Sequence, residues 1–152
     1  MIRPIAPNEA YPWALLLDAD PDKAVVESYL YNSQTLVYEE AGEMIGVLVY
    51  QNQGKNWEIM NVAVSPEKQG MGIGRQLLQA AEEAILSQHL GAKRPIVVIK
   101  TGSLSSAALT LYQKQGYVEK ERVKNYFTTH YVEPIFENGQ QLFDQVILEK
   151  QL

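Results

Sequence analysis

Gln69-Gly70-Met71-Gly72-Ile73-Gly74 is the segment from which the architecture can be worked out, because it joins a strand pattern to a helix pattern. The run from Trp57 to Val64 before it is predicted as the third strand of an antiparallel meander. After it, apolar residues recur at helical spacing: Ile73, Leu77, Leu78, Ala81, Ala84 and Ile85. The sequence therefore predicts a strand, a glycine-rich turn and the N-terminus of a long helix.

This turn has the chemistry of an anion-binding site. Its three glycines within five residues remove side-chain bulk where backbone N–H groups point outward. The N–H groups at a helix N-terminus lack intrahelical acceptors, and the helix dipole is positive there. Each N–H group that meets a charged oxygen contributes about 1.5–3 kcal/mol. A few such amides are enough to hold a pyrophosphate.

Two common phosphate-binding motifs do not match this turn. A Walker loop ends in Gly-Lys-Ser/Thr, whereas Gly74 is followed by Arg75 and Gln76. A dinucleotide fingerprint has a third glycine where Arg75 stands, and it lies in a parallel βαβ unit. The strands predicted before the turn are antiparallel instead. The phosphate ligand must be of another kind.

The other elements follow from local patterns. The predicted strands are Met1–Ile5, Thr35–Glu40, Met44–Gln51, Trp57–Val64, Pro95–Thr101, Tyr117–Val123 and Gln141–Glu149. The predicted helices are Asn8–Leu17, Pro21–Leu30 with Asp20 as its N-cap, the long helix opened by Gln69–Gly74, and Ser105–Gln115. The order βααβββαβαββ predicts an α/β sandwich, in which helices cover both faces of a mixed, mostly antiparallel sheet of about seven strands.

Composition narrows the function classes. A chain of 152 residues, 46% of them hydrophobic, predicts one domain over residues 1–152 that folds without a disulfide or a metal. It has no cysteine and two well-separated histidines, so we expect no metal site. The absence of a signal pattern and of an apolar run of about 20 residues predicts a soluble, cytoplasmic protein. The net charge of −5 argues against nucleic-acid and membrane partners.

Two motifs resemble one enzyme family. The pattern Gln/Arg-x-x-Gly-x-Gly/Ala, which resembles the acetyl-CoA-binding motif of the GNAT N-acetyltransferases, is met by Gln69, Gly72 and Gly74. The family's Ala-x-x-Leu-Tyr-x-x-x-Gly-Phe signature resembles the downstream residues Ala108, Leu111, Tyr112, Gly116 and Tyr117. The predicted order of elements also agrees along nearly the whole chain. The resemblance implies a GNAT-like three-layer sandwich and an acyltransferase that uses acetyl-CoA as co-substrate, without a metal.

The resemblance also implies where the coenzyme binds. In this family the strand before the turn splays from its neighbour at a bulge, and the pantetheine arm enters the gap like an added strand, bonded to backbone groups. The implied cofactor-binding residues are Val62, Ala63, Val64, Gln69, Gly70, Met71, Gly72, Ile73, Gly74, Arg75 and Ser105. Arg75 either adds a charge beside the pyrophosphate or is simply solvated. The family often has Asn where Ser105 stands, and a serine reaches less far.

Acetyl transfer to an amine needs a base, an oxyanion donor and an acid. Tyr112 matches the family's usual acid, since a phenol with an ordinary pKa of about 10 can protonate a thiolate; the alternative is a buried structural tyrosine. Glu58 matches the base of the histone-acetylating branch, acting through water; the alternative is a solvent-facing glutamate. Glu58, Met60 and Val62 are expected to alternate onto one face of the strand, and Asn61 lies on the other. The backbone N–H of Val64 is the expected oxyanion donor.

Other residues leave alternatives open. Lys100 stands where enzymes that acetylate ribosomal-protein N-termini carry a glutamate base, which argues against their mechanism. Lys124-Asn125-Tyr126-Phe127 nevertheless looks like the Asn-Tyr-Tyr stretch of that branch, so Tyr126 is either an acceptor-site residue or a core aromatic. The loop over residues 128–138 is either a lid or a plain surface loop, and its His130 is a base or is solvated.

The acceptor is inferred from charge. Residues 1–60 carry 3 basic and 9 acidic side chains. The resemblance places the first two helices and the last hairpin around the acceptor. The first 40 residues are acidic, with Asp18, Asp20, Asp22, Glu27, Glu39 and Glu40. We therefore expect a primary amine on a cationic small molecule, a peptide or a protein, attacking directly in a ternary complex. The alternatives are a non-catalytic acyl-CoA-binding or sensing module and a nucleotide-binding regulator; monomer and homodimer both stay open.

Overall fold

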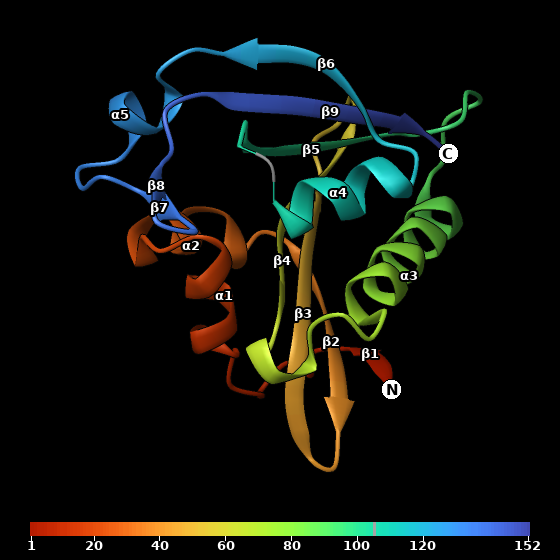
Figure 1. The fold of residues 1–152 in the computed structure, drawn as a ribbon. Helices are drawn as coiled ribbons and strands as arrows, with labels where there is room; N and C mark the ends of the chain where they lie inside the picture. The colour runs from red at the N-terminus through yellow and green to blue at the C-terminus, as the bar shows by residue number, and fades with distance from the viewer. Residues whose placement is uncertain (105) are drawn as a thin grey trace.

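The computed structural model describes residues 1–104 and 106–152 (Figure 1). Its strands are β1 (Ile2–Pro4), β2 (Gln34–Glu40), β3 (Glu43–Asn52), β4 (Trp57–Val64), β5 (Ile96–Gly102), β6 (Val118–Val123), β7 (Phe136–Glu137), β8 (Gln140–Gln141) and β9 (Gln145–Gln151). Its helices are α1 (Trp13–Ala19), α2 (Lys23–Leu30), α3 (Ile73–Gln88), α4 (Ala107–Lys114) and α5 (Tyr126–His130), with a 3-10 turn, η1 (Pro66–Lys68). The order agrees with the predicted one except for α5, β7 and β8, which were not predicted.

Seven strands form the main sheet, in the order β1-β2-β3-β4-β5-β9-β6. Only β4 and β5 run parallel, and every other neighbouring pair is antiparallel. The mixed, mostly antiparallel sheet is therefore confirmed. β7 and β8 form a separate two-stranded hairpin beside it.

Helices cover both faces of the sheet. α3 and α4 pack on one face, where Leu48, Leu77 and Tyr112 belong to the core. α1 and α2 pack on the other face, where Leu16 and Val26 are buried. These two cores give the predicted three-layer sandwich (Figure 1). Within the described ranges, the structure has no helix with the length and apolar character needed to cross a membrane.

The starts of α1 and α2 differ from the predictions. α1 begins at Trp13, directly after Pro12, and not at Asn8. Asp22 caps α2 by accepting hydrogen bonds from the amides of Ala24 and Val25 at 3.0 and 3.3 Å, so the cap is two residues later than the predicted Asp20. Asp20 does not cap this helix, so its carboxylate is free to accept hydrogen bonds from other residues.

A β-bulge in β4 opens the sheet. Asn61 pairs with Val49 and Ile59 pairs with Tyr50 in β3, so Met60 is an extra residue without a partner. β4 pairs with β5 only from Trp57 to Ile59 and then separates from it. The splayed strands implied by the family resemblance are therefore present.

The bulge also changes which side chains share a face of β4. Ile59 and Val62 both pack into the core under α3 and α4. Glu58, next to Ile59, consequently faces the opposite side from Val62. The expectation that Glu58, Met60 and Val62 share one face is wrong, because the extra residue at Met60 reverses the alternation.

Candidate active site

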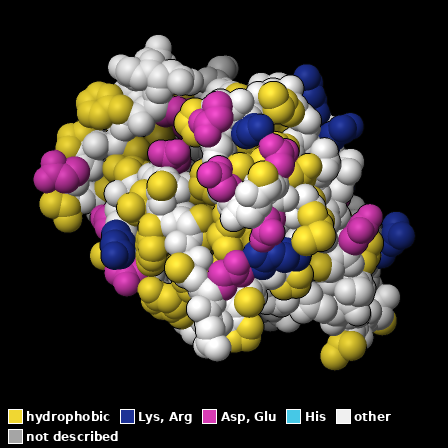
Figure 2. Space-filling model, turned by 90° about the horizontal axis from the view of Figure 1, so that it is seen from below, with side chains coloured by type: hydrophobic (Ala, Val, Ile, Leu, Met, Phe, Trp, Pro, Cys, Tyr) yellow, Lys and Arg dark blue, Asp and Glu magenta, His cyan; other side chains and the backbone are white. Residues whose placement is uncertain are grey.

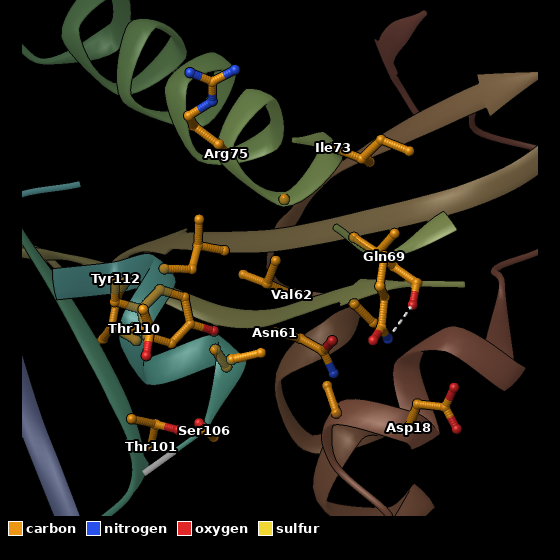
Figure 3. A pocket seen from close by; sticks show the side chains of 18 of the residues that line it. Asp18, Asn61, Val62, Gln69, Ile73, Arg75, Thr101, Ser106, Thr110 and Tyr112 are labelled. Atoms are coloured by element: carbon orange, nitrogen blue, oxygen red, sulfur yellow. Dashed lines mark hydrogen bonds between the residues drawn. The ribbon is translucent and has the colours of Figure 1, made fainter. Parts of the chain in front are cut away.

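A cavity of about 910 Å³ occupies the gap where β4 and β5 part (Figure 3). The glycine-rich turn and α4 line one part of it, and the end of α1, β5 and the β7–β8 hairpin line the other. We call these parts the donor half and the acceptor half. Figure 3 shows Tyr112 from α4 pointing into the space between them.

The glycines of the turn serve two purposes. Gly70 and Gly72 have φ values of +78° and +83°, a left-handed conformation that favours glycine, and Gly72 caps the N-terminus of α3. Gly74 is helical, but a Cβ there would lie only 2.9 Å from Cδ2 of Leu111, so its glycine lets α3 approach α4. The free amides of the first turn of α3 are left at the edge of the cavity.

The predicted loop residues gather at the donor half with one exception. The lining includes Gln69, Gly70, Gly72, Ile73, Gly74 and Arg75. Met71 is not among the lining residues, and 63% of it is exposed. The turn thus meets the cavity mainly through its backbone and its glycines.

The edge of β4 offers unpaired backbone groups to the cavity. The amide of Ser65 donates to the carbonyl of Ile45 in β3 at 2.8 Å. Because backbone groups alternate between the two sides of a strand, those of Val62 and Val64 point away from β3, toward the gap. Gln69 Nε2 donates to the Val64 carbonyl at 3.1 Å and ties the turn to this edge (Figure 3). Val62, Ala63 and Val64 all line the cavity.

Tyr112 lies at the junction of the two halves. Only 6% of it is exposed, and burial, followed by the negative charge of Glu137, raises its pKa to about 12. Its hydroxyl makes no hydrogen bond to any other described residue. The phenol therefore stays protonated at neutral pH and faces the gap (Figure 3).

The structure places Glu58 apart from Tyr112. Glu58 is buried, and its Oε1 lies 3.3 Å from Nζ of Lys100 on β5. Lys100 lines the cavity, but Glu58 does not. The predicted base is thus the ion-pair partner of a lining residue and does not itself line the cavity.

Glu137 is a lining residue that sequence reasoning missed. It ends β7 in the unpredicted hairpin, and Asn138 and Gly139 form the turn with φ values of +51° and +77°. Its pKa is raised because it is partly buried, and a side-chain hydrogen bond from Ser106 opposes this rise. Asn-Gly between two short strands is a strong hairpin signal, so the signal was present in the sequence.

The remaining predicted residues differ in whether they line the cavity. Ser105 lies outside the described residues, whereas Ser106 lines the cavity and caps α4 by accepting from the Leu109 amide at 3.0 Å. Tyr126 stacks on His130 with ring centroids 4.1 Å apart. Neither ring is among the lining residues. The loop over residues 128–138 reaches the cavity through Glu137 and Asn138 instead.

The acidic residues of the first 40 positions do not form one cleft. Of the six predicted there, only Asp18 lines the cavity. Glu39 pairs with Arg3, and Glu40 lies 2.8 Å from Lys68. Figure 2 shows acidic side chains interspersed with basic ones over one face of the molecule. The predicted acidic cleft is therefore wrong in its composition.

Asp20 instead belongs to a hydrogen-bonded cluster that joins β4, α1, α2 and the loop after α5, which we call the acceptor wall. Its carboxylate accepts from the hydroxyl of Tyr131 at 3.0 Å and from that of Tyr29 at 3.4 Å, and burial raises its pKa. Asn61 Nδ2 donates to the Leu16 carbonyl at 3.0 Å and to the Tyr29 hydroxyl at 3.1 Å. One chain of hydrogen bonds thus joins the β4 bulge, α1, α2 and the loop after α5.

Comparison with known proteins points to one family. Residues 31–119 match the model of the acetyltransferase (GNAT) domain. The uncharacterized N-acetyltransferase YvbK of Bacillus subtilis is 40% identical over 136 residues, which are 88% of this chain and 84% of YvbK. A GNAT family acetyltransferase from Elizabethkingia anophelis with acetyl-CoA bound has a TM-score of 0.91 and 35% identity, covering 100% of this chain and 97% of its own. The IAA acetyltransferase of Bacillus cereus has a TM-score of 0.89 and 38% identity, covering 100% and 99%.

Proposed function

Because the chain belongs to the GNAT acetyltransferase family, we propose that it moves the acetyl group of acetyl-CoA to a primary amine on a cationic small molecule, a peptide or a protein. Family membership agrees with the acyltransferase class and the acetyl-CoA co-substrate predicted from the sequence. We take residues 1–152 as one N-acetyltransferase domain, since both cores close around the same sheet.

The continuity of the cavity carries this proposal. It runs from the amide-rich turn, along the open edge of β4, past Tyr112 and on to Asp18 and Glu137. A ligand with a pyrophosphate at one end and a reactive thioester at the other would fit this sequence of surfaces. The acceptor amine would then approach from the opposite end, which supports direct attack within a ternary complex.

The donor half supplies backbone groups for each part of acetyl-CoA. The first-turn amides of α3 meet the pyrophosphate, where the helix dipole favours an anion. The free backbone groups of Val62 bond the pantetheine arm as a neighbouring strand would. At Val64 only the amide is free, because the carbonyl accepts from Gln69. The same edge brings the thioester carbonyl to the Val64 amide, which donates to the oxyanion.

Tyr112 supplies the proton for the departing thiolate. Its raised pKa, caused by burial, keeps the hydroxyl protonated at neutral pH, which is the state that a general acid needs. The same rise makes it a weaker acid, so the transfer depends on a sulfur placed within hydrogen-bond reach. Such a placement follows from a pantetheine arm held along β4.

A thiol-release assay tests the proposal. The purified chain is mixed with acetyl-CoA and a panel of amines (spermidine, lysine, tyramine, kanamycin and a short peptide), and the free thiol is measured over time. We expect turnover with at least one cationic amine and inhibition by high salt. Acetyl-CoA binding without turnover would favour a non-catalytic acyl-CoA-binding module. Stabilisation by ATP but not by CoA would favour a nucleotide-binding regulator.

A further inference from the structure

Glu137 is placed to take part in the reaction. It lines the same cavity as Tyr112, and its negative charge contributes to the raised pKa of the Tyr112 phenol. β7 ends at Glu137 and the tight turn at Asn138 and Gly139 follows it, so the β7–β8 hairpin brings this carboxylate to the cavity. Its carboxylate is therefore close enough for its charge to act on the phenol that would face the departing sulfur.

The other carboxylates near the gap are less suited to take a proton there. Glu58 is bound to Lys100 at 3.3 Å and does not line the cavity. Asp18 lines it but is exposed at the end of α1. Glu137 is partly withdrawn from water, and that desolvation raises its pKa, which makes it a stronger base than an exposed carboxylate.

We propose that Glu137 is the catalytic base, which accepts a proton from the ammonium form of the acceptor amine. This inference rests on the proposed function, because it assigns the base of that reaction. It assigns a second role too: before proton transfer, the carboxylate binds the ammonium and selects acceptors that carry a positive charge.

Glu137 takes one proton from the ammonium, and the nitrogen lone pair then attacks the thioester carbonyl carbon to form the C–N bond. The C–S bond breaks with its electron pair on sulfur, which takes the hydroxyl proton of Tyr112. The second nitrogen proton returns to Tyr112 through solvent, and the proton on Glu137 leaves to solvent. The net products are the amide, the free thiol of coenzyme A and one proton.

Replacing Glu137→Gln tests the assignment, with Glu133→Gln as the matched control. Glu133 is an exposed glutamate of the same loop and does not line this cavity. The other charged or titratable lining residues stay in place: Asp18, Lys68, Lys100, Tyr112, Lys114 and Arg75. The rates of the most active amine of the panel are measured from about pH 6 to about pH 10, and acetyl-CoA affinity is measured by calorimetry.

We expect E137Q to lower kcat about 100-fold near neutral pH and to leave acetyl-CoA affinity within about twofold. The loss should shrink as pH rises toward the pKa of the amine, since free amine then needs no base. Glu137→Asp should restore part of the rate, and E133Q should resemble the wild type.

Three outcomes would overturn the assignment. If the wild type turns over and E137Q has the same rate and pH profile, Glu137 is not the base, and the proposed function still stands. A rate loss that is the same at every pH, or that comes with lost acetyl-CoA affinity, makes the residue structural. A wild-type chain that binds acetyl-CoA but acetylates no amine overturns the proposed function and, with it, this inference.

Discussion

The two halves of the cavity are built from different material. The donor half is made of backbone: two left-handed glycines, the first turn of α3 and the open edge of β4. The acceptor half is made of side chains on elements far apart in the chain, including Asp18, Lys100 and Glu137. A backbone site is encoded by a short run of residues, whereas a side-chain site depends on how distant elements meet. The donor half is therefore the part that a sequence motif can reveal.

The largest expected effect is at the junction of the halves. Tyr112→Phe should slow turnover about 10–1000-fold, because the departing thiolate loses its proton donor. Acetyl-CoA affinity should change little, since the ring still fills its buried position. Steady-state kinetics and calorimetry on the same preparation check both statements. Equal losses in kcat and in acetyl-CoA affinity would show that Tyr112 helps to bind the coenzyme and does not donate the proton.

A pair of glycines tests whether the donor half binds through its backbone. Gly72→Ala and Gly42→Ala each place a side chain on a left-handed residue, with φ values of +83° and +81°. Both should lower the free energy of unfolding by about 1–2 kcal/mol. Only G72A should weaken acetyl-CoA binding, by about tenfold or more, because its Cβ keeps one charge-assisted bond from forming. Thermal unfolding and calorimetry measure the two effects, and equal affinities in the two variants would contradict the backbone model.

The errors of sequence reasoning have particular causes. The fold followed from periodicity, and the glycine-rich turn from its motif, because both signals are local. The bulge at Met60 has no such signal, and it reversed the side of β4 on which Glu58 lies. Asp20 resembled a helix cap, but Asp22 holds that position and Asp20 accepts from Tyr131, a contact across 111 residues. No local pattern encodes that pairing.

The hairpin that carries Glu137 is a different kind of error. Its turn residues, Asn138 and Gly139, were visible in the sequence and predict a two-residue hairpin. The strands on either side have only two residues each, too short to show alternation. A search for strand periodicity therefore passes over them, whereas a search for turn residues finds them.

A smaller effect is expected at the acceptor wall. Tyr131→Phe removes the 3.0 Å hydrogen bond to Asp20, which ties the loop after α5 to the end of α1. A hydrogen bond to a charged group contributes about 1.5–3 kcal/mol, and Tyr29 still partly satisfies the carboxylate. We expect KM for the amine to rise about threefold to tenfold, with acetyl-CoA affinity unchanged. A weaker acetyl-CoA affinity with an unchanged KM for the amine would show that the two halves are coupled through this wall.

The smallest effect is expected at Glu58, and it bears on which half holds the base. Glu58→Gln leaves Lys100 without its ion-pair partner, but Lys100 is 40% exposed, so water compensates for most of the loss. We expect kcat to fall less than about threefold, because the residue does not line the cavity. The same amine and the same pH range used for E137Q make the two variants directly comparable. A fall of about 100-fold in E58Q, with E137Q near the wild type, would return the role of base to Glu58 acting through water. In that case the acceptor half, like the donor half, would take its chemistry from β4.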